Sequence, residues 1–332
     1  MIESIRFKNF KILRDAELPL GRFTLIVGPN GSGKSTALQA LQTVYQKTQG
    51  FSDMVTVSLQ SAKEASVEIT LRWGAPHSGM VTTESYSSTN ARNFRNVDSQ
   101  GKKVAGGALE AELASIRVYS LDAPAIAAKV GLDPEMELSP NGSKLAGVLD
   151  QLRDRDPERF EALNKELGRW LPEFDRILFE TPNAGQRAFL LRTRKGHHAI
   201  SAIDLSQGTV LALAILTLAY LPDPPSIVGI EEPDRGVHPR LLRNIQDALY
   251  RLSCPENFGE KREPVQVIAT THSPYFLDLY KDHPEEIVIA QKTADGARFE
   301  RLSEQPHLRE VLGDAPFGEV WYSGVLGGVP VE

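Results

Sequence analysis

The hydrophobic positions of this chain follow two repeating patterns, one typical of strands and one typical of helices. Strands buried on both faces read as short continuous apolar runs, whereas a strand with one solvated face alternates apolar and polar residues. Between Val67 and Trp73 every second residue is apolar, which predicts a strand with one buried face. Strands are also predicted at 2–10, 23–27, 54–59, 116–121, 187–194, 227–230, 265–269 and 287–290.

The helical pattern has apolar residues that recur three or four positions apart. It predicts helices at 37–41, 208–221 and 239–252, and a pair of helices within 143–171. The alternation of strands and helices, most regular after residue 200, favours an α/β fold. The helical pair predicts a lobe beside the sheet.

One long segment, residues 74–107, is polar and rich in Gly, Ser, Thr and Asn, which predicts a long loop or a loose hairpin. Four basic residues lie in it: Arg92, Arg95, Lys102 and Lys103. They could contact nucleic acid, but a solvated surface is the preferred interpretation.

The composition and charge of the chain are those of a globular protein with a modest acidic excess. The 332 residues are 41% hydrophobic and 24% charged, with 43 acidic residues against 37 basic ones. This balance weighs against a general nucleic-acid-binding surface, which needs clustered Lys and Arg. The longest apolar run, 210–221, is too short to span a membrane, and no secretory segment opens the chain. A single cysteine, Cys254, excludes an internal disulfide and fits a reducing cytoplasm.

Residues 28–35 read Gly-Pro-Asn-Gly-Ser-Gly-Lys-Ser and match the phosphate-binding loop G-x-x-x-x-G-K-[ST]. The motif stands between a predicted strand and a predicted helix, which is the context that it requires. Its glycines allow several backbone N–H groups to point at one anion. Lys34 is expected to reach the β- and γ-phosphates, and Ser35 to offer its hydroxyl to Mg²⁺. The expected nucleotide contacts of this loop are Asn30, Gly31, Ser32, Gly33, Lys34, Ser35 and Thr36.

Three later segments carry residues suited to the same chemistry. Glu231 and Glu232 follow a predicted strand, where the first acid can hold Mg²⁺ through water and the second can activate the attacking water. His272 follows another strand and can contact the γ-phosphate. A solvated acidic loop and a structural histidine are the alternatives, and the order of the motifs favours the functional interpretation. Ser206 precedes an apolar helix, so it suits either an anion site or a plain helix cap.

In this order the motifs resemble those of ABC-type ATPases of the RecF, SMC and OLD branch, often described as AAA-type ATPases. The resembling segments are the opening at 5–11, Walker A at 28–35, the ABC signature at 205–209, Walker B at 231–233, the D-loop at 236–239 and the switch histidine His272. The resemblance implies a P-loop ATPase head of the ABC type, with a mixed sheet and an inserted helical lobe. It implies one head over residues 1–332, made of a nucleotide-binding part (1–75), an inserted loop and lobe (76–200) and a signature, Walker B and switch part (201–332).

The resemblance also implies a mechanism that needs a homodimer. In this family two heads enclose two ATP molecules, so Ser206, Gln207 and Gly208 are expected to contact the γ-phosphate that Lys34 of a partner holds. Ser35 and Glu231 become the expected Mg²⁺ ligands, and Glu232, His272 and Lys34 the expected catalytic residues. No glutamine matches the family's Q-loop, whose equivalent is expected near 119–122. Either Phe7 or Phe10 is a candidate neighbour of the adenine, with core packing preferred for both.

Three functions remain open for such a head. The preferred one is a dimeric ATPase switch in a bacterial anti-phage defence or DNA-maintenance system. OLD-like relatives often carry a TOPRIM nuclease after the head, and the 60 residues after His272 lack its acidic metal cluster, which predicts an effector in trans. The alternatives are a RecF-like repair ATPase that binds DNA and, less favoured, the ATP-binding subunit of a membrane transporter.

Overall fold

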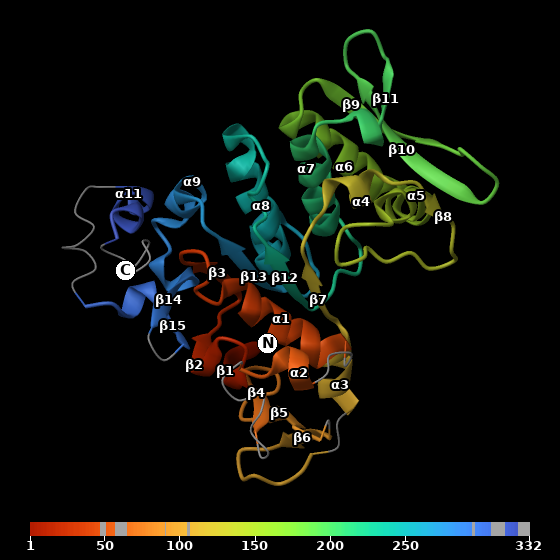
Figure 1. Cartoon of the computed structure of the whole chain (residues 1–332). Coiled ribbons are helices and arrows are strands. Elements are labelled where there is room, and N and C mark those ends of the chain that lie inside the picture. Colours follow the sequence, from red (N-terminus) through yellow and green to blue (C-terminus); the bar gives the residue numbers. More distant parts are fainter. Residues whose placement is uncertain are drawn as a thin grey trace. The chain divides into compact units, whose positions relative to one another are not determined.

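The computed structural model describes residues 1–46, 51–56, 65–89, 91–104, 107–293, 296–306 and 316–324 (Figure 1). The chain divides into two compact units. The first comprises Met1–Val118, Pro225–Glu231 and Arg262–Glu332, and the second comprises Tyr119–Pro224 and Glu232–Lys261. Each unit thus gathers segments that lie far apart in the sequence.

The centre of the first unit is a six-stranded sheet in the order β15-β14-β3-β13-β12-β7. Its strands are β3 (Phe23–Val27), β7 (Ile116–Tyr119), β12 (Ile227–Glu231), β13 (Gln266–Thr271), β14 (Ile287–Thr293) and β15 (Gly296–Arg301). Strands β12, β13, β3 and β14 are parallel, and β15 pairs antiparallel with β14. The mixed α/β sheet expected from the sequence is therefore present. Strands β3, β12 and β13 are almost wholly buried, as their continuous apolar runs predict.

A second sheet of the first unit is antiparallel and has five strands in the order β2-β1-β4-β5-β6. Its strands are β1 (Ile2–Phe10), β2 (Leu13–Pro19), β4 (Ser66–Trp73), β5 (Val81–Ser87) and β6 (Arg92–Val97). Gln266 of β13 connects the two sheets, because its side-chain amide accepts from Ile2 N at 2.8 Å and donates to Ile2 O at 2.7 Å. The core is continuous between the two sheets.

Within the segment 74–107, strands β5 and β6 form a hairpin, so the prediction of a long loop is wrong and that of a hairpin is right. Strand β5 buries Thr82, Glu84 and Tyr86 on one face. Polar atoms of these side chains are paired within the sheet: Trp73 Nε1 donates to Thr82 Oγ1 at 2.9 Å, and Tyr86 Oη donates to Glu84 at 2.7 Å. The polar sequence does not define the strand bounds here, because side chains that hydrogen-bond one another occupy part of the buried face.

Five described helices belong to the first unit: α1 (Lys34–Gln46), α2 (Phe51–Met54), α3 (Gly107–Ala114), α9 (Pro274–Leu277) and α11 (Phe317–Tyr322). Helix α1 follows β3, as predicted. The strand predicted at 54–59 is wrong where the structure describes it, since Met54 ends α2 and Val55 makes only an isolated bridge with Phe10. Residues 57–59 lie outside the described residues.

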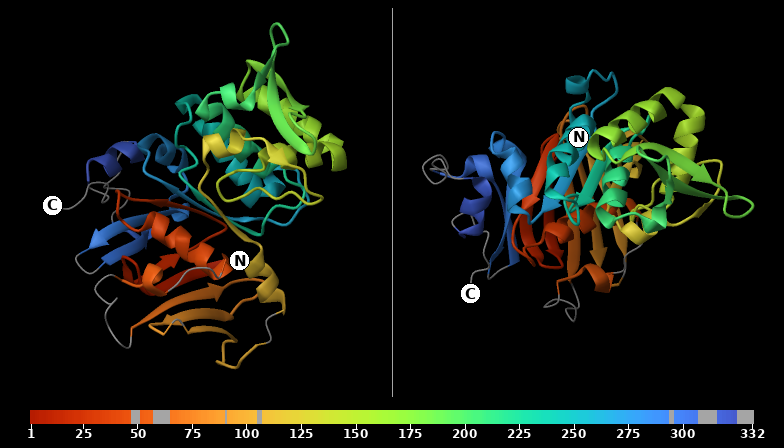
Figure 2. Two further views of the ribbon diagram at one scale, coloured as in Figure 1. Left: turned by 45° about the vertical axis from the view of Figure 1, so that its right-hand side comes forward. Right: turned by 90° about the horizontal axis from the view of Figure 1, so that it is seen from above.

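The second unit is largely helical and contains the pair of helices predicted within 143–171. Its helices are α4 (Ala123–Ala127), α5 (Leu145–Arg155), α6 (Pro157–Trp170), α7 (Gln207–Ala219) and α8 (Leu242–Ser253). Its strands are β8 (Val130–Gly131), β9 (Phe174–Glu180), β10 (Gln186–Thr193) and β11 (Ala199–Ser201), and β9 and β10 form a long hairpin (Figure 2). Asp156 caps α6 by accepting from Arg159 N at 3.0 Å. Among the described residues of the whole chain, no helix has the length and apolar character needed to cross a membrane.

Candidate active site

The phosphate-binding motif forms the turn between β3 and α1, and its glycines are required sterically. Gly31 and Gly33 have φ of +76° and +98°, a backbone region that other residues rarely adopt. A Cβ added to Gly28 would lie 2.3 Å from the backbone oxygen of Ala290. A Cβ on Gly33 would lie 2.9 Å from Leu13 Cδ2. The start of β2 thus packs against the loop, a contact that no local sequence signal predicts.

Two polar side chains of the loop point to an anion. Lys34 is buried, and its ammonium donates to the carbonyl oxygens of Gly28 at 2.7 Å and Pro29 at 3.1 Å. The hydroxyl of Ser32 is fully buried and has no hydrogen-bond partner among the described residues. A buried hydroxyl with no partner is uncommon, and a phosphate oxygen in the loop would satisfy it. The loop, with the N-terminus of α1 behind it, therefore fits the phosphates of a nucleotide.

The contact that links the loop to a second strand joins Ser35 and Glu231. The hydroxyl of Ser35 donates to Oε1 of Glu231, which ends β12. A serine hydroxyl and one carboxylate are ligands that Mg²⁺ accepts beside substrate phosphates. Among the described residues no group of three His, Cys, Asp or Glu side chains is placed to hold a metal. The donors present thus fit a Mg²⁺ ion that a nucleotide helps to hold.

His272 lies at the same edge of the sheet as the phosphate loop. In the register of the parallel strands, Thr271 of β13 stands opposite Val27 of β3, and Thr270 stands opposite Glu231. His272 follows Thr271 directly and is exposed. The first unit therefore brings Lys34, Ser35, Glu231 and His272 to one sheet edge.

Glu232 has a backbone conformation that is uncommon for its residue type. Its φ is +45°, and its carbonyl oxygen accepts from Arg235 N at 3.0 Å in a tight turn. A residue other than glycine with positive φ is held there by its surroundings, and such positions concentrate at functional sites. The backbone at Glu232 therefore suits a residue whose side chain has to keep one direction for its function.

The signature-like segment caps α7 in the second unit. Ser206 Oγ accepts from Thr209 N at 3.2 Å, so the cap predicted from the sequence is confirmed. A Cβ on Gly208 would lie 2.8 Å from the backbone oxygen of Gly236, so the start of α7 packs closely on the turn that follows Glu232. Arg235 in that turn donates to Leu121 O at 2.9 Å, within the 119–122 segment where the Q-loop equivalent is expected. The sequence does not predict this contact of Arg235, because an arginine in a turn has no distinctive pattern.

The aromatic candidates for the adenine are core residues, which confirms the preferred interpretation. Phe7 and Phe10 are fully buried, and Phe7 packs against Phe299 with ring centroids 6.1 Å apart.

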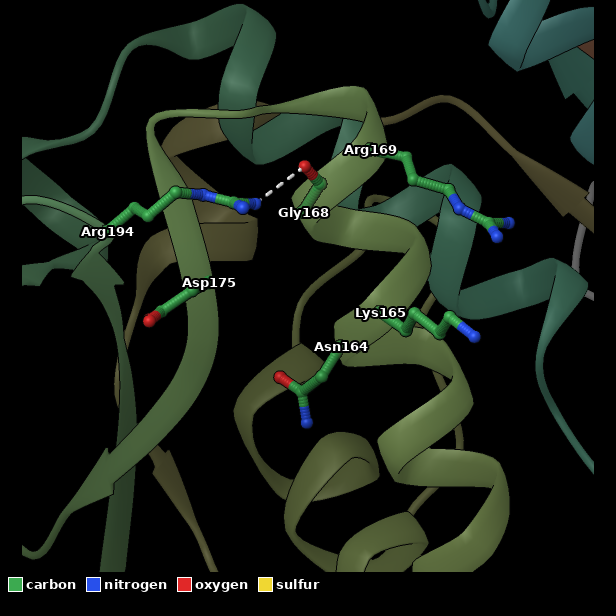
Figure 3. Close-up of a pocket in the computed structure, with 6 residues that line it drawn as sticks. All are labelled: Asn164, Lys165, Gly168, Arg169, Asp175 and Arg194. Atoms are coloured by element: carbon green, nitrogen blue, oxygen red, sulfur yellow. Dashed lines mark hydrogen bonds between the residues drawn. The ribbon is translucent and has the colours of Figure 1, made fainter.

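The second unit has a hollow of about 310 Å³ between α6 and the β9–β10 hairpin (Figure 3). Arg194 donates to Gly168 O at 3.0 Å, the bond dashed in Figure 3, and Asn164 accepts from Ile177 N at 2.7 Å. Asp175 pairs with Arg192 at 2.8 Å, and this hydrogen bond lowers the pKa of Asp175. The first two contacts hold the hairpin to α6 and the third joins β9 to β10, so these side chains have a structural role in the second unit.

Comparison with known families assigns the fold to AAA-type ATPase domains. Residues 108–278, just over half of the chain, match the family model described as "AAA domain, putative AbiEii toxin, Type IV TA system". Residues 1–109 match the model described as "AAA ATPase domain". The chain belongs to this AAA-domain family.

The chain is also similar to individual proteins. An OLD nuclease of Thermus scotoductus is 25% identical in a match over 87% of this chain and 64% of that protein, so the chain spans less than two thirds of the relative's length. The SMC head domain from Thermotoga maritima has a TM-score of 0.53 at 16% identity, covering 90% of this chain and 98% of that one. This likeness confirms the predicted head fold. The recombination mediator protein RecF of the RecFOR pathway has a TM-score of 0.48 at 12% identity, over 91% of this chain and 98% of that one.

Proposed function

We propose that this chain hydrolyses ATP to ADP and phosphate and acts as a dimeric switch. The observation that carries the proposal is the Ser35–Glu231 contact beside the buried Lys34, at the edge where His272 also lies. A lysine, a Mg²⁺-ligand pair and an imidazole at one phosphate loop are groups that suit phosphoryl transfer to water.

Each side chain has a separate task in this mechanism. Lys34 binds the β- and γ-phosphates and stabilises the negative charge that builds up between them. Ser35 and Glu231 would hold Mg²⁺, which neutralises phosphate charge when bound. Glu232 accepts a proton from the attacking water, whose oxygen forms a bond to the γ-phosphorus as the bond to the bridging oxygen of ADP breaks. His272 donates a hydrogen bond to the γ-phosphate.

Two considerations support the proposed dimer: the arrangement that the family resemblance implies, and the cap of α7. The first turn of α7 offers free backbone N–H groups beside Ser206, and these groups suit a phosphate. In the proposed dimer, Ser206, Gln207 and Gly208 of one chain contact the γ-phosphate bound to Lys34 of the other chain. Because ATP then binds the closed dimer more tightly than the monomer, ATP shifts the equilibrium towards closure and hydrolysis reverses it.

Glu232→Gln tests the hydrolysis and the dimer together. The glutamine keeps the shape of the side chain but accepts no proton, so we expect turnover to fall at least about a hundredfold while ATP still binds. Light scattering should then show an ATP-dependent dimer that persists. Glu135→Gln, an exposed glutamate of the same unit, is the matched control. A Glu232→Gln variant that binds ATP but stays monomeric would contradict the dimer.

The last part of the proposal concerns the biological role of the switch. We assign it to a bacterial anti-phage defence or DNA-maintenance system in the cytoplasm, acting through an effector encoded separately. The relative named OLD nuclease supports a role beside a nuclease. The arrangement of neighbouring genes tests this assignment, since a permease gene beside this one would favour a transporter instead.

DNA is the alternative partner, which this chain would bind directly. The acidic excess of the chain weighs against it. A filter-binding titration with duplex DNA at low salt, with and without ATP, decides: binding would favour the RecF-like function, and no binding would remove it.

A further inference from the structure

We propose that helix α11, through Gly318, positions the segment that carries His272 and thereby controls ATP hydrolysis. The inference rests on the proposed function, because it requires His272 to contact the γ-phosphate. It concerns a part of the chain that none of the motifs includes, and α11, His272 and the phosphate loop all belong to the first unit.

The first observation is the close approach of α11 to Pro274, two residues after His272. A Cβ on Gly318 would lie 2.6 Å from the backbone oxygen of Pro274 and 2.7 Å from its Cβ. Atoms of real side chains do not come so close, so only glycine permits this packing. Helix α11 therefore lies directly against the start of α9.

A hydrogen bond makes a second connection between the same two segments. The backbone N–H of Gly318 donates to Asp278 Oδ1 at 2.7 Å. Asp278 directly follows α9, and Ser273 caps the start of α9 by accepting from Phe276 N at 3.4 Å. Gly318 thus contacts both ends of α9, and the capped end adjoins His272.

The segment between these contacts is packed too tightly to absorb a shift of α11. Phe276 and Tyr280 are fully buried with ring centroids 5.4 Å apart, and Tyr280 stacks on Phe23 at 5.2 Å. Phe23 begins β3, the strand that leads to the phosphate loop. Because a packed interior is not readily compressed, a displacement of Pro274 is passed to the exposed His272 rather than to the core.

The coupling has to work in both directions. If the position of α11 sets the contact of His272 with ATP, then ATP at His272 stabilises one position of α11. ADP lacks the γ-phosphate and should not have this effect. Helix α11 therefore reports which nucleotide is bound, and its amide hydrogens can be followed.

The decisive variants are Gly318→Ala and the pair Asp278→Ala and Asp278→Asn. The alanine at 318 displaces Pro274, and Asp278→Ala removes the acceptor, so we expect each to lower the rate of ATP hydrolysis about tenfold. ADP affinity should stay within about twofold, because no ADP contact changes. Asp278→Asn keeps an acceptor oxygen and should restore hydrolysis. Gly107→Ala is the control, since a Cβ there meets nothing within 4 Å.

Hydrogen exchange separates coupling from a loss of structure. In the wild-type chain the amides of 317–324 should exchange more slowly with ATP than with ADP, and Gly318→Ala should abolish this difference. Hydrolysis in Gly318→Ala and Asp278→Ala equal to that of Gly107→Ala would overturn the inference. Failure of the wild-type chain to bind ATP would instead overturn the proposed function and the inference with it. Should Gly318→Ala not fold, Asp278→Ala and Asp278→Asn test the same coupling without steric insertion.

Discussion

The hydroxyl of Ser35 donates a hydrogen bond to the carboxylate of Glu231, although 196 positions separate the two residues in the chain. The contact joins the first turn of α1 to the end of β12. The glutamate side chain is long enough for its carboxylate to reach Ser35 from the end of β12. In the proposed mechanism, Ser35 and Glu231 are therefore the residues that would bind Mg²⁺.

Glu231→Gln should weaken the Mg²⁺ dependence of ATP binding. An amide oxygen is a poorer ligand for Mg²⁺ than a carboxylate, so the gain in ATP affinity on adding Mg²⁺ should fall about tenfold. Affinity without Mg²⁺ should not fall, because the variant removes a negative charge near the phosphates. Calorimetric titrations with and without Mg²⁺ measure both quantities. Glu300→Gln, at a partly exposed glutamate of β15, is the control, and an equal Mg²⁺ effect in both variants would remove Glu231 from the site.

Gly28→Ala should damage both the phosphate loop and the stability of the chain. The added Cβ would meet the backbone oxygen of Ala290 at 2.3 Å, and neither backbone can move freely inside the sheet. We expect a loss of about 2–3 kcal/mol in the free energy of unfolding and no measurable ATP binding. Gly107→Ala has open space and should change stability by no more than about 0.5 kcal/mol. Urea denaturation measures the free energy of unfolding of both variants. Equal values would show that the loop adapts to the added Cβ.

Lys34→Ala tests the contribution of the loop's positive charge to nucleotide binding separately from that of its backbone shape. Lys34 donates to the loop carbonyls of Gly28 and Pro29 and is the proposed ligand of the β- and γ-phosphates. The alanine should abolish nucleotide binding as measured by calorimetry, with the fold retained in circular dichroism. Undiminished binding would refute the assignment of this loop.

Substitutions of Ser206 separate its structural role from its proposed functional role. Ser206→Ala removes the cap of α7 and should cost about 1 kcal/mol of stability. Ser206→Asp keeps a good cap but brings a negative charge towards the partner's γ-phosphate, so stability should stay while ATP-dependent dimerisation is lost. Asp156→Ala, which uncaps α6, should lower stability without changing the ATP response. A Ser206→Asp chain that still dimerises with ATP would contradict the proposed contact.

Asp247→Asn should stabilise the chain near neutral pH but not in acid. Asp247 lines a hollow of about 210 Å³ with Trp170 and Tyr220. Although Asp247 is exposed as a whole, partial desolvation of its carboxyl raises its pKa and is the largest cause of the shift; the charge of Arg243 opposes it, and that of Glu166 adds to it. The unfolded chain therefore releases this proton at a lower pH than the folded chain does. Folded stability falls as pH rises from the unfolded-state pKa of about 3.9 through the raised folded-state pKa, and the full penalty is present above it.

Thermal melts at about pH 7 and about pH 3 test this linkage. Asp247→Asn should raise the melting temperature at the higher pH by about 1–2 °C and leave it unchanged at the lower pH. Asp223→Asn, at an exposed aspartate of the same unit, is the control. A gain of equal size at both pH values would show that the charge of Asp247 is not its cause.

Elements with a clear local pattern were predictable from the sequence. The phosphate loop, β3 and α1 follow from one motif between an apolar run and a helical repeat, and α5 and α6 follow from apolar positions at helical spacing. A hairpin was predicted in this region, but the bounds of strand β5 were not predictable. Glu84 and Tyr86 occupy its buried face, where their hydrogen bond and the ion pair of Glu84 with Arg92 compensate their polarity. The strand predicted at 54–59 was wrong at Met54, which instead buries its side chain at the end of α2.

The sequence by itself determined the class of site, since the spacing of Gly28, Lys34 and Ser35 imposes a phosphate-binding turn on any chain that places it between a strand and a helix. It also determined which acids and which histidine end the strands of the sheet. Only the tertiary structure decided that Ser35 meets Glu231 and that Gly318 packs on Pro274. The physical reason is that such contacts depend on strand order, register and packing between distant segments, none of which leaves a periodic signal in the residues themselves.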